Sequence, residues 1–335
     1  MKKMKSKLNV LILVVITILV LYFSLKDDFH NIVNQIMNIN VWLLIVAFLM
    51  VITYWLLRSK AVSIFTKKFS PKTTYWSSLQ MMVRTQFFNA VTPFATGGQP
   101  YQVYHLIKDG VSATISTSII IQNFIVYQIA MVLLGIIAVV CNQAFGIFAR
   151  DSLLRHLVTL GFIINTAVIV VLFIVAFSTK MNKKLVHLGI KILTKLKLVK
   201  DKEKKLKEWD EYINNFHESA KILLENKGHF VLTILCNLVA LCCLYSIPYV
   251  LLCATGDFTS FSLPMAIITS AYVMIIGSFV PIPGGSGGLE YGFVSFYGTF
   301  ITGSKLMAIM LLWRFVTYYF GMIVGAIALN MKKVD

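Results

Sequence analysis

Long apolar runs recur along this chain and constrain its fold more than any other feature. Six uninterrupted runs are each long enough to cross the roughly 30 Å hydrocarbon core of a bilayer as a helix. They occupy residues 8–25, 41–57, 113–141, 157–178, 229–254 and 305–330. Two further segments, 77–98 and 263–302, are apolar but interrupted by Gly and Pro. We therefore predict an all-α polytopic membrane protein with about six full transmembrane helices and two re-entrant or broken-helix segments.

The chain is too apolar for a soluble protein of its length. Of its 335 residues, 58% are hydrophobic and 13% are charged, and the mean hydropathy is +0.78. Soluble domains carry about 25% charged residues, so too few polar side chains are present here to coat a water-facing surface. The first apolar run follows a basic start, as in a signal peptide, but no small-residue cleavage site follows it. We interpret it as a retained helix, and residues 1–335 as a single integral membrane domain.

We attribute the formal net charge of +17 to membrane topology and not to nucleic-acid binding. Basic residues collect before the first apolar run, directly after the second run, within 179–228 and after the last run. Cytoplasmic loops carry such an excess of Lys and Arg. If both interrupted segments return to their side of origin, these clusters and both termini lie on the cytoplasmic face of the cell membrane. Few basic residues then lie outside, namely Lys26, Arg150, Arg155 and Lys305.

The chain offers no pattern for a metal, a disulfide framework or a nucleotide cofactor. Its five cysteines lie in or at the ends of apolar runs, without a C-x-x-C pair or a nearby His, and are typical of small packing residues. A G-x-x-x-x-G-K-[S/T] phosphate loop does not occur. We expect no cofactor, and transport that is either downhill or coupled to an ion gradient.

Residues 179–228 form the only sizeable polar part of the chain, predicted to be a cytoplasmic basic insert. Apolar side chains step by three and four between Lys, Glu and Asp, which predicts two amphipathic helices. These side chains are Leu185, Leu188, Ile192, Leu196 and Val199, then Leu206, Trp209, Ile213, Phe216, Ala220 and Leu223. Basic amphipathic helices lie in the headgroup layer, where anionic lipids attract them. The alternative is that the two helices pack on each other.

One pattern occurs twice in the interrupted segments. Residues 93–101 and 283–291 both follow P-x-x-[S/T]-G-G-x-x-Y, 190 positions apart. On the predicted topology the first would enter from the cytoplasm and the second from outside. This arrangement is typical of transporters built from an inverted repeat, which bind their substrate near the midplane between broken helices.

Irregular backbone inside a bilayer survives only against protein or a water-filled cavity, because unpaired N–H and C=O groups cost several kcal/mol each in lipid. Proline ends a helix, and glycines let the chain turn and expose successive N–H groups as an anion-binding nest. The same residues also serve close helix packing and kinks, which is the structural alternative. The candidate substrate-binding residues of the two loops are Pro93, Thr96, Gly97 and Gly98, then Pro283, Gly284, Gly285, Ser286, Gly287 and Gly288.

Ionisable side chains at membrane depth are functional candidates because their burial is costly. Arg84, Glu290 and Arg314 qualify, and Asn89 lies between Arg84 and the first loop. Either arginine suits a headgroup phosphate through bidentate hydrogen bonds. Glu290 suits an ammonium group, a coupling proton or an arginine partner. The structural alternatives are a buried ion pair, and for Arg84 a side chain that reaches the cytoplasmic interface.

The two loops resemble a known family. The stretch Phe279-Val280-Pro281-Ile282-Pro283-Gly284-Gly285-Ser286-Gly287-Gly288-Leu289-Glu290 is similar to the signature loop of the flippase-like transmembrane region of lysylphosphatidylglycerol synthases, and Asn89–Pro93 with Gly97-Gly98 resembles its earlier motif. The resemblance covers roughly Trp42 to Asn330. It implies lipid translocation in the cell membrane, with Glu290 as a functional acid.

Two departures from the family pattern bear on the cargo. Gln99-Pro100 stands where an acidic residue often follows the glycine of the first motif, and no soluble aminoacyltransferase domain precedes Asp335. We therefore expect no lipid synthesis by this chain. An aminoacyl-phospholipid, a glycolipid and a polyprenyl-phosphate carrier all remain possible cargoes.

Three functions compete at this point. The leading prediction is a lipid flippase or transporter. An enzyme is the second, because residues 284–288 satisfy the G-x-S-x-G pattern of a nucleophile elbow, although no His follows Ser286 in the chain. The third is a non-transporting membrane partner that anchors a separate lipid-modifying synthase through residues 179–228.

Overall fold

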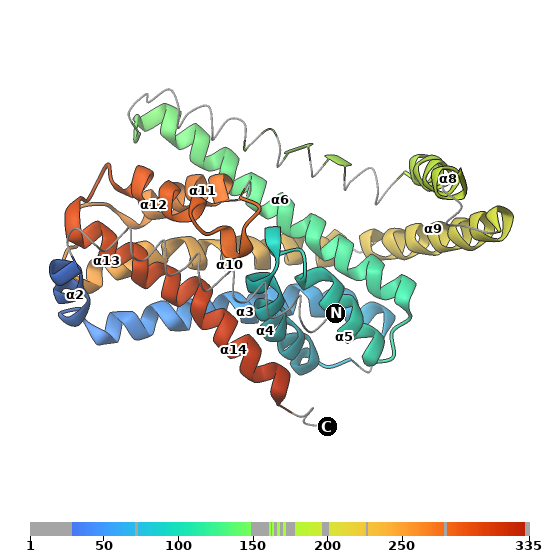
Figure 1. Ribbon diagram of the computed structural model, residues 1–335, viewed down its shortest axis with the longest axis horizontal. Coiled ribbons are helices and arrows are strands. Elements are labelled where there is room, and N and C mark those ends of the chain that lie inside the picture. Colours follow the sequence, from blue (N-terminus) through green and yellow to red (C-terminus); the bar gives the residue numbers. More distant parts are fainter. Residues whose placement is uncertain are drawn as a thin grey trace.

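The computed structural model describes residues 29–70, 73–148, 178–195, 201–225, 227–277 and 280–331, together with scattered positions between 161 and 171. Most of these residues are helical, and there is no strand among them (Figure 1). The elements are α2 (Phe29–Met37), α3 (Val41–Phe69), α4 (Tyr75–Val91), η1 (Pro93–Ala95), α5 (Gly98–Lys108), α6 (Ala113–Phe145), α8 (Thr179–Lys195), α9 (Lys202–Glu225), α10 (Lys227–Ala254), α11 (Leu263–Gly277), η2 (Pro283–Gly285), α12 (Gly288–Tyr297), α13 (Gly303–Arg314), the π-helical turn η3 (Phe315–Tyr319) and α14 (Phe320–Asn330). The predicted all-α polytopic class is confirmed.

Within the described part of the chain, four helical stretches are long and apolar enough to cross a membrane. They are α3, α6, α10 and the continuous helix from Gly303 to Asn330. Each contains one of the predicted spans. The predicted span 8–25 lies outside the described residues, and 157–178 lies mostly outside them.

The helix that contains the second predicted span, 41–57, is longer than that span. Helix α3 continues to Phe69 and is about 43 Å long at 1.5 Å per residue. The basic residues that follow the span, from Arg58 to Lys68, were predicted to lie in a loop, and this is wrong, because they lie within α3. Arg and Lys are good helix formers, and they do not end a helix by themselves. Asn40 begins α3 by accepting hydrogen bonds from the backbone N–H groups of Trp42 and Leu43.

The two interrupted segments fold as helical hairpins, α4–η1–α5 and α11–η2–α12. In the first, Ser77 near the start of α4 hydrogen-bonds with His105 and Asp109 at the end of α5. In the second, the hydroxyl of Tyr297 at the end of α12 donates to the carbonyl of Ala266 near the start of α11. Each hairpin therefore returns to the end of the bundle from which it came.

The hairpins enter from opposite ends, and their tips meet. The backbone N–H of Asn40 donates to Ala254 O at 2.8 Å, so the start of α3 lies at the end of α10 and the two helices run in opposite directions. The first hairpin follows the end of α3, and the second follows the end of α10. Turns η1 and η2 are in contact between these two ends (Figure 1).

The element order repeats at the offset of the sequence pattern. Turn η1 begins at Pro93 and η2 at Pro283, α5 begins at Gly98 and α12 at Gly288, and α6 begins at Ala113 and α13 at Gly303. Each pair is separated by 190 positions. The repeat therefore extends from nine residues to a whole hairpin and the long helix that follows it. Its inversion across a membrane remains a prediction.

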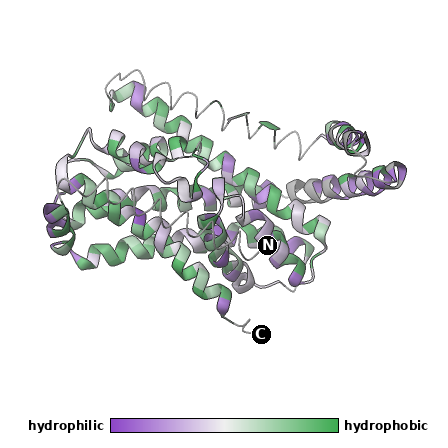
Figure 2. Cartoon of the chain, viewed as in Figure 1, coloured by the Kyte–Doolittle hydropathy of each residue, from purple (hydrophilic) through white to green (hydrophobic). Residues whose placement is uncertain are grey.

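The polar insert forms two helices that pack on each other, which was the alternative interpretation of its sequence. The imidazole of His187 in α8 lies 3.0 Å from the carboxylate of Asp210 in α9, and Ile190 and Ile213 are both buried. Figure 2 shows hydrophilic residues along α9 and hydrophobic residues along the bundle helices. Placement of this insert in the headgroup layer stays a prediction.

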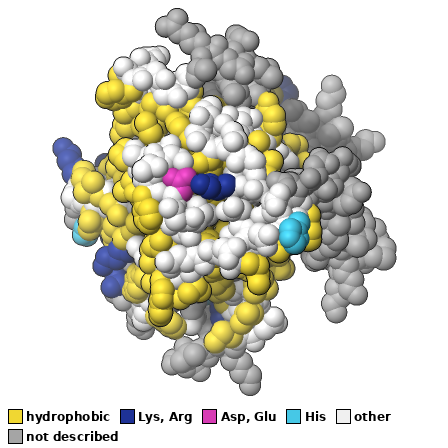
Figure 3. All heavy atoms as spheres, turned by 90° about the vertical axis from the view of Figure 1, so that its left-hand side faces the viewer, with side chains coloured by type: hydrophobic (Ala, Val, Ile, Leu, Met, Phe, Trp, Pro, Cys, Tyr) yellow, Lys and Arg dark blue, Asp and Glu magenta, His cyan; other side chains and the backbone are white. Residues whose placement is uncertain are grey.

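The end of the molecule where α10 leads into α11 has a mainly uncharged face. Figure 3 shows this end, with an acidic and a basic side chain touching near the centre of the view. Lys305 Nζ lies 2.8 Å from Asp257 Oδ2 in this region. This ion pair joins the loop before α11 to the first turn of α13.

Candidate functional site

A buried ion pair joins the second hairpin to the last long helix. Glu290 lies in the first turn of α12, where its Oε2 accepts a hydrogen bond from the N–H of Gly287 at 2.7 Å. Its Oε1 lies 2.8 Å from Arg314 Nε, and Nε has no aligned hydrogen bond. Glu290 is 9% exposed and Arg314 4%. An acid is favoured at this position both by the cation and by the positive end of the helix.

Arg314 also holds the backbone of the second tip. Its Nη2 donates to the carbonyl of Gly284 at 3.0 Å and to the hydroxyl of Ser286 at 3.3 Å. The guanidinium carbon lies 4.5 Å from the centre of the Tyr318 ring. One side chain of the last long helix thus contacts the turn, the acid and an aromatic face. The sequence left open which arginine pairs with Glu290, and the structure shows that it is Arg314.

The second tip requires glycine at Gly284. Its φ is +68°, and a Cβ there would lie 2.3 Å from the Tyr318 ring. Gly285 and Gly287 have φ of +61° and +86°, in the region that L side chains rarely adopt. Gly288 needs no positive φ, but a Cβ would lie 2.1 Å from Val280. These glycines allow the turn and the close approach of neighbouring side chains.

The first tip has a similar backbone at two positions and a different one beyond them, since Gly97 has a φ of −77° and the equivalent Gly287 +86°. Phe94 and Ala95 have φ of +52° and +54°, at the positions equivalent to Gly284 and Gly285. Thr92 Oγ1 accepts from the N–H of Gly97 at 2.9 Å, and the hydroxyl of Thr96 donates to the carbonyl of Pro93 at 2.9 Å.

Two further residues of the first hairpin are in close contact. A Cβ on Gly98 would lie 2.0 Å from Asn89 Oδ1, so this glycine lets α5 approach α4 closely. The same approach brings the Asn89 side chain to the tip of the hairpin.

The sequence predicted that backbone N–H groups of the glycine-rich tips bind an anion. This prediction is wrong for those N–H groups whose hydrogen-bond partners the structure gives. The N–H groups of Ala95, Thr96 and Gly285 donate to carbonyls within their own tips. Those of Gly97 and Gly287 donate to Thr92 and Glu290. These donors are used to hold the turns. The guanidinium of Arg314 is a cationic donor at the second tip.

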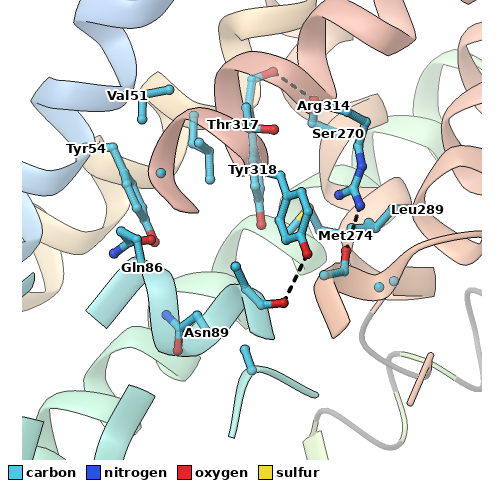
Figure 4. A pocket seen from close by; sticks show the side chains of 18 of the residues that line it. Val51, Tyr54, Gln86, Asn89, Ser270, Met274, Leu289, Arg314, Thr317 and Tyr318 are labelled. Carbon is cyan, nitrogen blue, oxygen red and sulfur yellow. Dashed lines mark hydrogen bonds between the residues drawn. The ribbon is translucent and has the colours of Figure 1, made fainter. Parts of the chain in front are cut away.

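A cavity of about 520 Å³ lies where the two tips meet. Figure 4 shows side chains from both hairpins and from the long helices around it. Among the predicted site residues, Asn89, Gly284, Gly285 and Arg314 line it. Phe94 also lines the cavity and is 56% exposed, so the cavity reaches the surface beside the first tip.

Tyr318 connects the two hairpins across this cavity. Its ring covers Gly284 of the second tip, and its hydroxyl donates to the carbonyl of Ala90 at 3.0 Å, at the end of α4 (Figure 4). Tyr318 lies in the π-helical turn η3, one helical turn beyond Arg314. Such turns are frequent at functional sites.

Sequence reasoning missed most of the uncharged polar lining of the cavity. These residues sit in apolar runs without a pattern that marks them. They are Tyr54, Gln86, Tyr245, Ser270, Thr317 and Tyr318. Gln128 also lines the cavity; its place in an apolar run predicts an interhelical hydrogen bond, with a cavity-lining role as the alternative. Aromatic side chains with polar tips let the wall accept both a polar group and an apolar chain.

Arg84 is part neither of the Glu290–Arg314 ion pair nor of the cavity lining. Its Nε donates to the carbonyl of Ala328 at 2.8 Å and its Nη2 to that of Met331 at 3.3 Å. The last carbonyls of a helix carry partial negative charge, which a cation compensates. Arg84 is 8% exposed and is not among the cavity-lining residues. These contacts give it a structural role, holding the end of α14 against α4, and its contact with a substrate stays a prediction.

The contacts of Ser286 do not match those of a nucleophile. Its hydroxyl donates to the carbonyl of Pro283 at 3.2 Å and accepts from Arg314. The described residues place no His at hydrogen-bond distance from it. They also contain no group of three or more His, Cys, Asp or Glu side chains that could hold a metal ion.

Sequence comparison decides the family. The family model of the lysylphosphatidylglycerol synthase TM region matches residues 9–325. The chain belongs to this family. The resemblance drawn from the two loops is thereby confirmed, and both hairpins and the cavity lie within the matched region.

Two relatives have names that state no activity. The "UPF0104 membrane protein" of Archaeoglobus fulgidus is 24% identical over 336 residues, which cover 98% of this chain and 97% of the relative. The "Uncharacterized protein MG306 homolog" of Mycoplasma pneumoniae is 23% identical over 336 residues, with 92% of this chain and 82% of the relative covered. The likeness to both extends over nearly the whole lysylphosphatidylglycerol synthase TM region.

Proposed function

We propose that this protein is a lipid flippase or transporter, which moves a polar-headgroup lipid across the cytoplasmic membrane through the cavity between the two hairpin tips. The observation that carries the proposal is the Arg314–Glu290 ion pair, whose arginine lines a cavity where two helical hairpins from opposite ends of the bundle meet. Polar groups inside a membrane protein face such cavities when they handle a polar substrate.

The ion pair gives the cavity a way to accept a headgroup phosphate. A phosphate that reaches Arg314 replaces Glu290 as the partner of the guanidinium, so no buried cation is left unpaired. Glu290 then takes up a proton or pairs with an ammonium group of the headgroup. Removing one partner of a buried pair without replacement costs about 3–5 kcal/mol, so this exchange lowers the barrier to headgroup entry.

The cargo is an aminoacyl-phospholipid, a glycolipid or a polyprenyl-phosphate carrier. Acyl chains remain in the surrounding lipid, in line with the exposed apolar side chains on the outer faces of α3, α6 and α10, such as Leu49, Ile137 and Val239. We place both termini and the α8–α9 insert on the cytoplasmic side, next to anionic headgroups.

Leaflet exchange in proteoliposomes tests the proposal. The protein is reconstituted with a headgroup-labelled phospholipid, and the fraction of label reachable by a membrane-impermeant quencher is followed in time. We expect exchange by the wild type and loss of exchange in Glu290→Gln. Glu211→Gln, which removes an exposed acid of α9, is the matched control and should exchange lipid as the wild type does.

The result that contradicts the proposal is unchanged exchange in a folded Glu290→Gln protein. A non-transporting partner of a separate synthase predicts a different pattern. In that case deletion of residues 179–228 abolishes the cellular function, and Glu290→Gln has no effect on it.

A further inference from the structure

Three arginines are buried among the described residues of the bundle, and they differ in how their charge is compensated. Arg314 faces the Glu290 carboxylate. Arg84 binds carbonyls at the end of α14. Arg58 of α3 has neither kind of partner. It is 9% exposed and lies within 4 Å of no described carboxylate.

The contacts of Arg58 leave part of its guanidinium unused. Its Nη1 donates to Asn237 Oδ1 of α10 at 2.6 Å, and its central carbon lies 3.9 Å from the centre of the Tyr127 ring of α6. Its Nε is buried and has no hydrogen-bond partner in the described structure. Nε is one of the atoms with which a guanidinium edge binds phosphate bidentately.

Arg58 lies directly behind the wall of the cavity. On α3 the cavity is lined by Val51, Tyr54 and Trp55, and Arg58 follows Tyr54 by one helical turn. On α6, Tyr127 is next to the lining residue Gln128. Arg58 is therefore adjacent to the cavity on the side of the Phe69 end of α3, which is the predicted cytoplasmic end.

A second buried atom on the same side also lacks a partner. Asn123 precedes Tyr127 by one turn of α6 and is 2% exposed, and its Oδ1 accepts no hydrogen bond in the described structure. Donors and acceptors buried without partners are rare in proteins and call for an explanation. The unpaired Nε of Arg58 is a donor and calls for an acceptor such as a phosphate oxygen. The Oδ1 of Asn123 calls for a donor, so the oxyanion site rests on Arg58 alone.

We propose that Arg58 is a second oxyanion-binding site of this protein, which takes a phosphate group at the cytoplasmic end of the cavity. A buried guanidinium without an anion is unfavourable, and a phosphate oxygen at Nε and Nη supplies both the charge and the hydrogen bonds that Asn237 and Tyr127 leave unmet. That the phosphate belongs to a lipid headgroup, handed between Arg58 and Arg314, rests on the proposed function. Oxyanion binding at Arg58 does not.

Thermal unfolding of the detergent-purified full chain tests this site. The Tm is measured alone, with dihexanoyl-phosphatidylglycerol, with inorganic phosphate and with dihexanoylglycerol, which lacks phosphate. The proteins compared are the wild type, Arg58→Gln, Arg58→Lys and Lys60→Gln. Lys60 is exposed on the same helix, so its variant is the matched control for loss of one charge.

We expect the phosphate-bearing lipid to raise the Tm of the wild type and of Lys60→Gln by several degrees, as ligands that bind only the folded state do. Arg58→Gln should lose at least half of this rise. Arg58→Lys keeps the charge but not the bidentate edge and should lie between them. Dihexanoylglycerol should produce no Arg58-dependent rise. An Arg58-dependent rise with inorganic phosphate alone supports the oxyanion site and assigns its ligand to a free anion.

Two results would overturn the inference. One is the same lipid-dependent rise in Arg58→Gln as in the wild type. The other is a rise of equal size with dihexanoylglycerol that is likewise lost in Arg58→Gln, because the site would then not require a phosphate. Both readouts concern binding. Absence of leaflet exchange by the wild type would therefore refute the proposed function and leave this site standing.

Discussion

The two hairpin tips have a related backbone and different side chains. In both, a short turn contains two residues in the left-handed region, and a helix starts at the equivalent glycine. They differ just before that helix, where Gly97 has a φ of −77° and Gly287 one of +86°. The first tip places Phe94 and Ala95 in that region, is mostly exposed, and has no charged residue between Pro93 and Tyr101. The second places glycines there, and it contains the buried Glu290 that pairs with Arg314.

The difference indicates that the two tips have different roles. The second tip is fixed by an ion pair, by two further hydrogen bonds from Arg314, and by the contact of Gly284 with Tyr318. The first tip keeps residues in a conformation that costs L-residues about 1–2 kcal/mol each. It lies where the cavity opens to the surface. We expect the second tip to be the stable binding side and the first to move when a headgroup enters.

The largest effect should come from breaking the ion pair of the second tip. Glu290→Gln leaves Arg314 buried without an anion and should lower the free energy of unfolding by about 3–5 kcal/mol. The double variant Glu290→Gln/Arg314→Gln removes both charges and should recover most of this loss. Denaturant unfolding in detergent measures both. A double variant as unstable as the single variant would show that the charges act separately.

The next largest effect should come from Gly284, whose equivalent in the first tip is Phe94. Gly284→Ala places a Cβ against Tyr318 and an L-residue at φ +68°, and we expect a loss of roughly 2–4 kcal/mol from the two effects together. The control is Gly110→Ala, because Gly110 has φ +88° and a Cβ added there would have no neighbour within 4 Å. Its loss should be about 1–2 kcal/mol. Equal losses in the two variants, measured by thermal unfolding, would show that the Tyr318 contact adds nothing.

Tyr318→Phe should have a smaller effect on stability, and its effect on hydrogen exchange should differ between the two tips. It removes the hydrogen bond to the carbonyl of Ala90 and keeps the ring on Gly284, so we expect a loss of about 1 kcal/mol. If the first tip is the mobile one, amide hydrogen exchange should rise around residues 90–97 and stay unchanged around 283–290. Equal rises at both tips would argue against a mobile first tip and a stable second tip.

The smallest effect should come from the outer end of the second hairpin. Lys305 and the hydroxyl of Ser260 hold the pKa of Asp257 well below its usual range. A lowered pKa stabilises the fold above the unfolded pKa, about 3.9, and this stability is lost as the pH falls through the lower folded pKa. Asp257→Asn should therefore cost about 1 kcal/mol at neutral pH and less below pH 4. A cost that is independent of pH between 3 and 7 would contradict this origin.

The sequence predicted the parts of this site that carry a local signal. The repeat of residues 93–101 in 283–291, the glycines of the second loop and the isolated acid at Glu290 are each visible in an otherwise apolar stretch, and the structure brings all of them to the meeting tips. Arg314 was found for the same reason. Membrane-depth charge and broken apolar periodicity were sufficient signals for these residues.

Other features depend on packing that no local pattern reveals. Arg58 follows an apolar run and was assigned to a cytoplasmic loop, since only the contacts with Asn237 and Tyr127 show that it is buried. Arg84 was a substrate candidate because no local pattern showed its hydrogen-bond partner, a backbone carbonyl more than 240 positions away in the sequence. Tyr318 reaches the cavity from a π-helical turn, a register that a regular helix does not predict.

The most direct measurement is the chemical identity of what occupies the cavity. A photoreactive amino acid is placed at Ala95, which lines the cavity, and in a second protein at Ile137, which is 53% exposed on the outer face of α6. After illumination in native membranes, mass spectrometry identifies the attached molecules and the site of attachment. We predict adducts through a phosphate-bearing headgroup at Ala95 and through acyl chains at Ile137. Acyl-chain adducts at both positions, with no headgroup attachment at Ala95, would contradict the account.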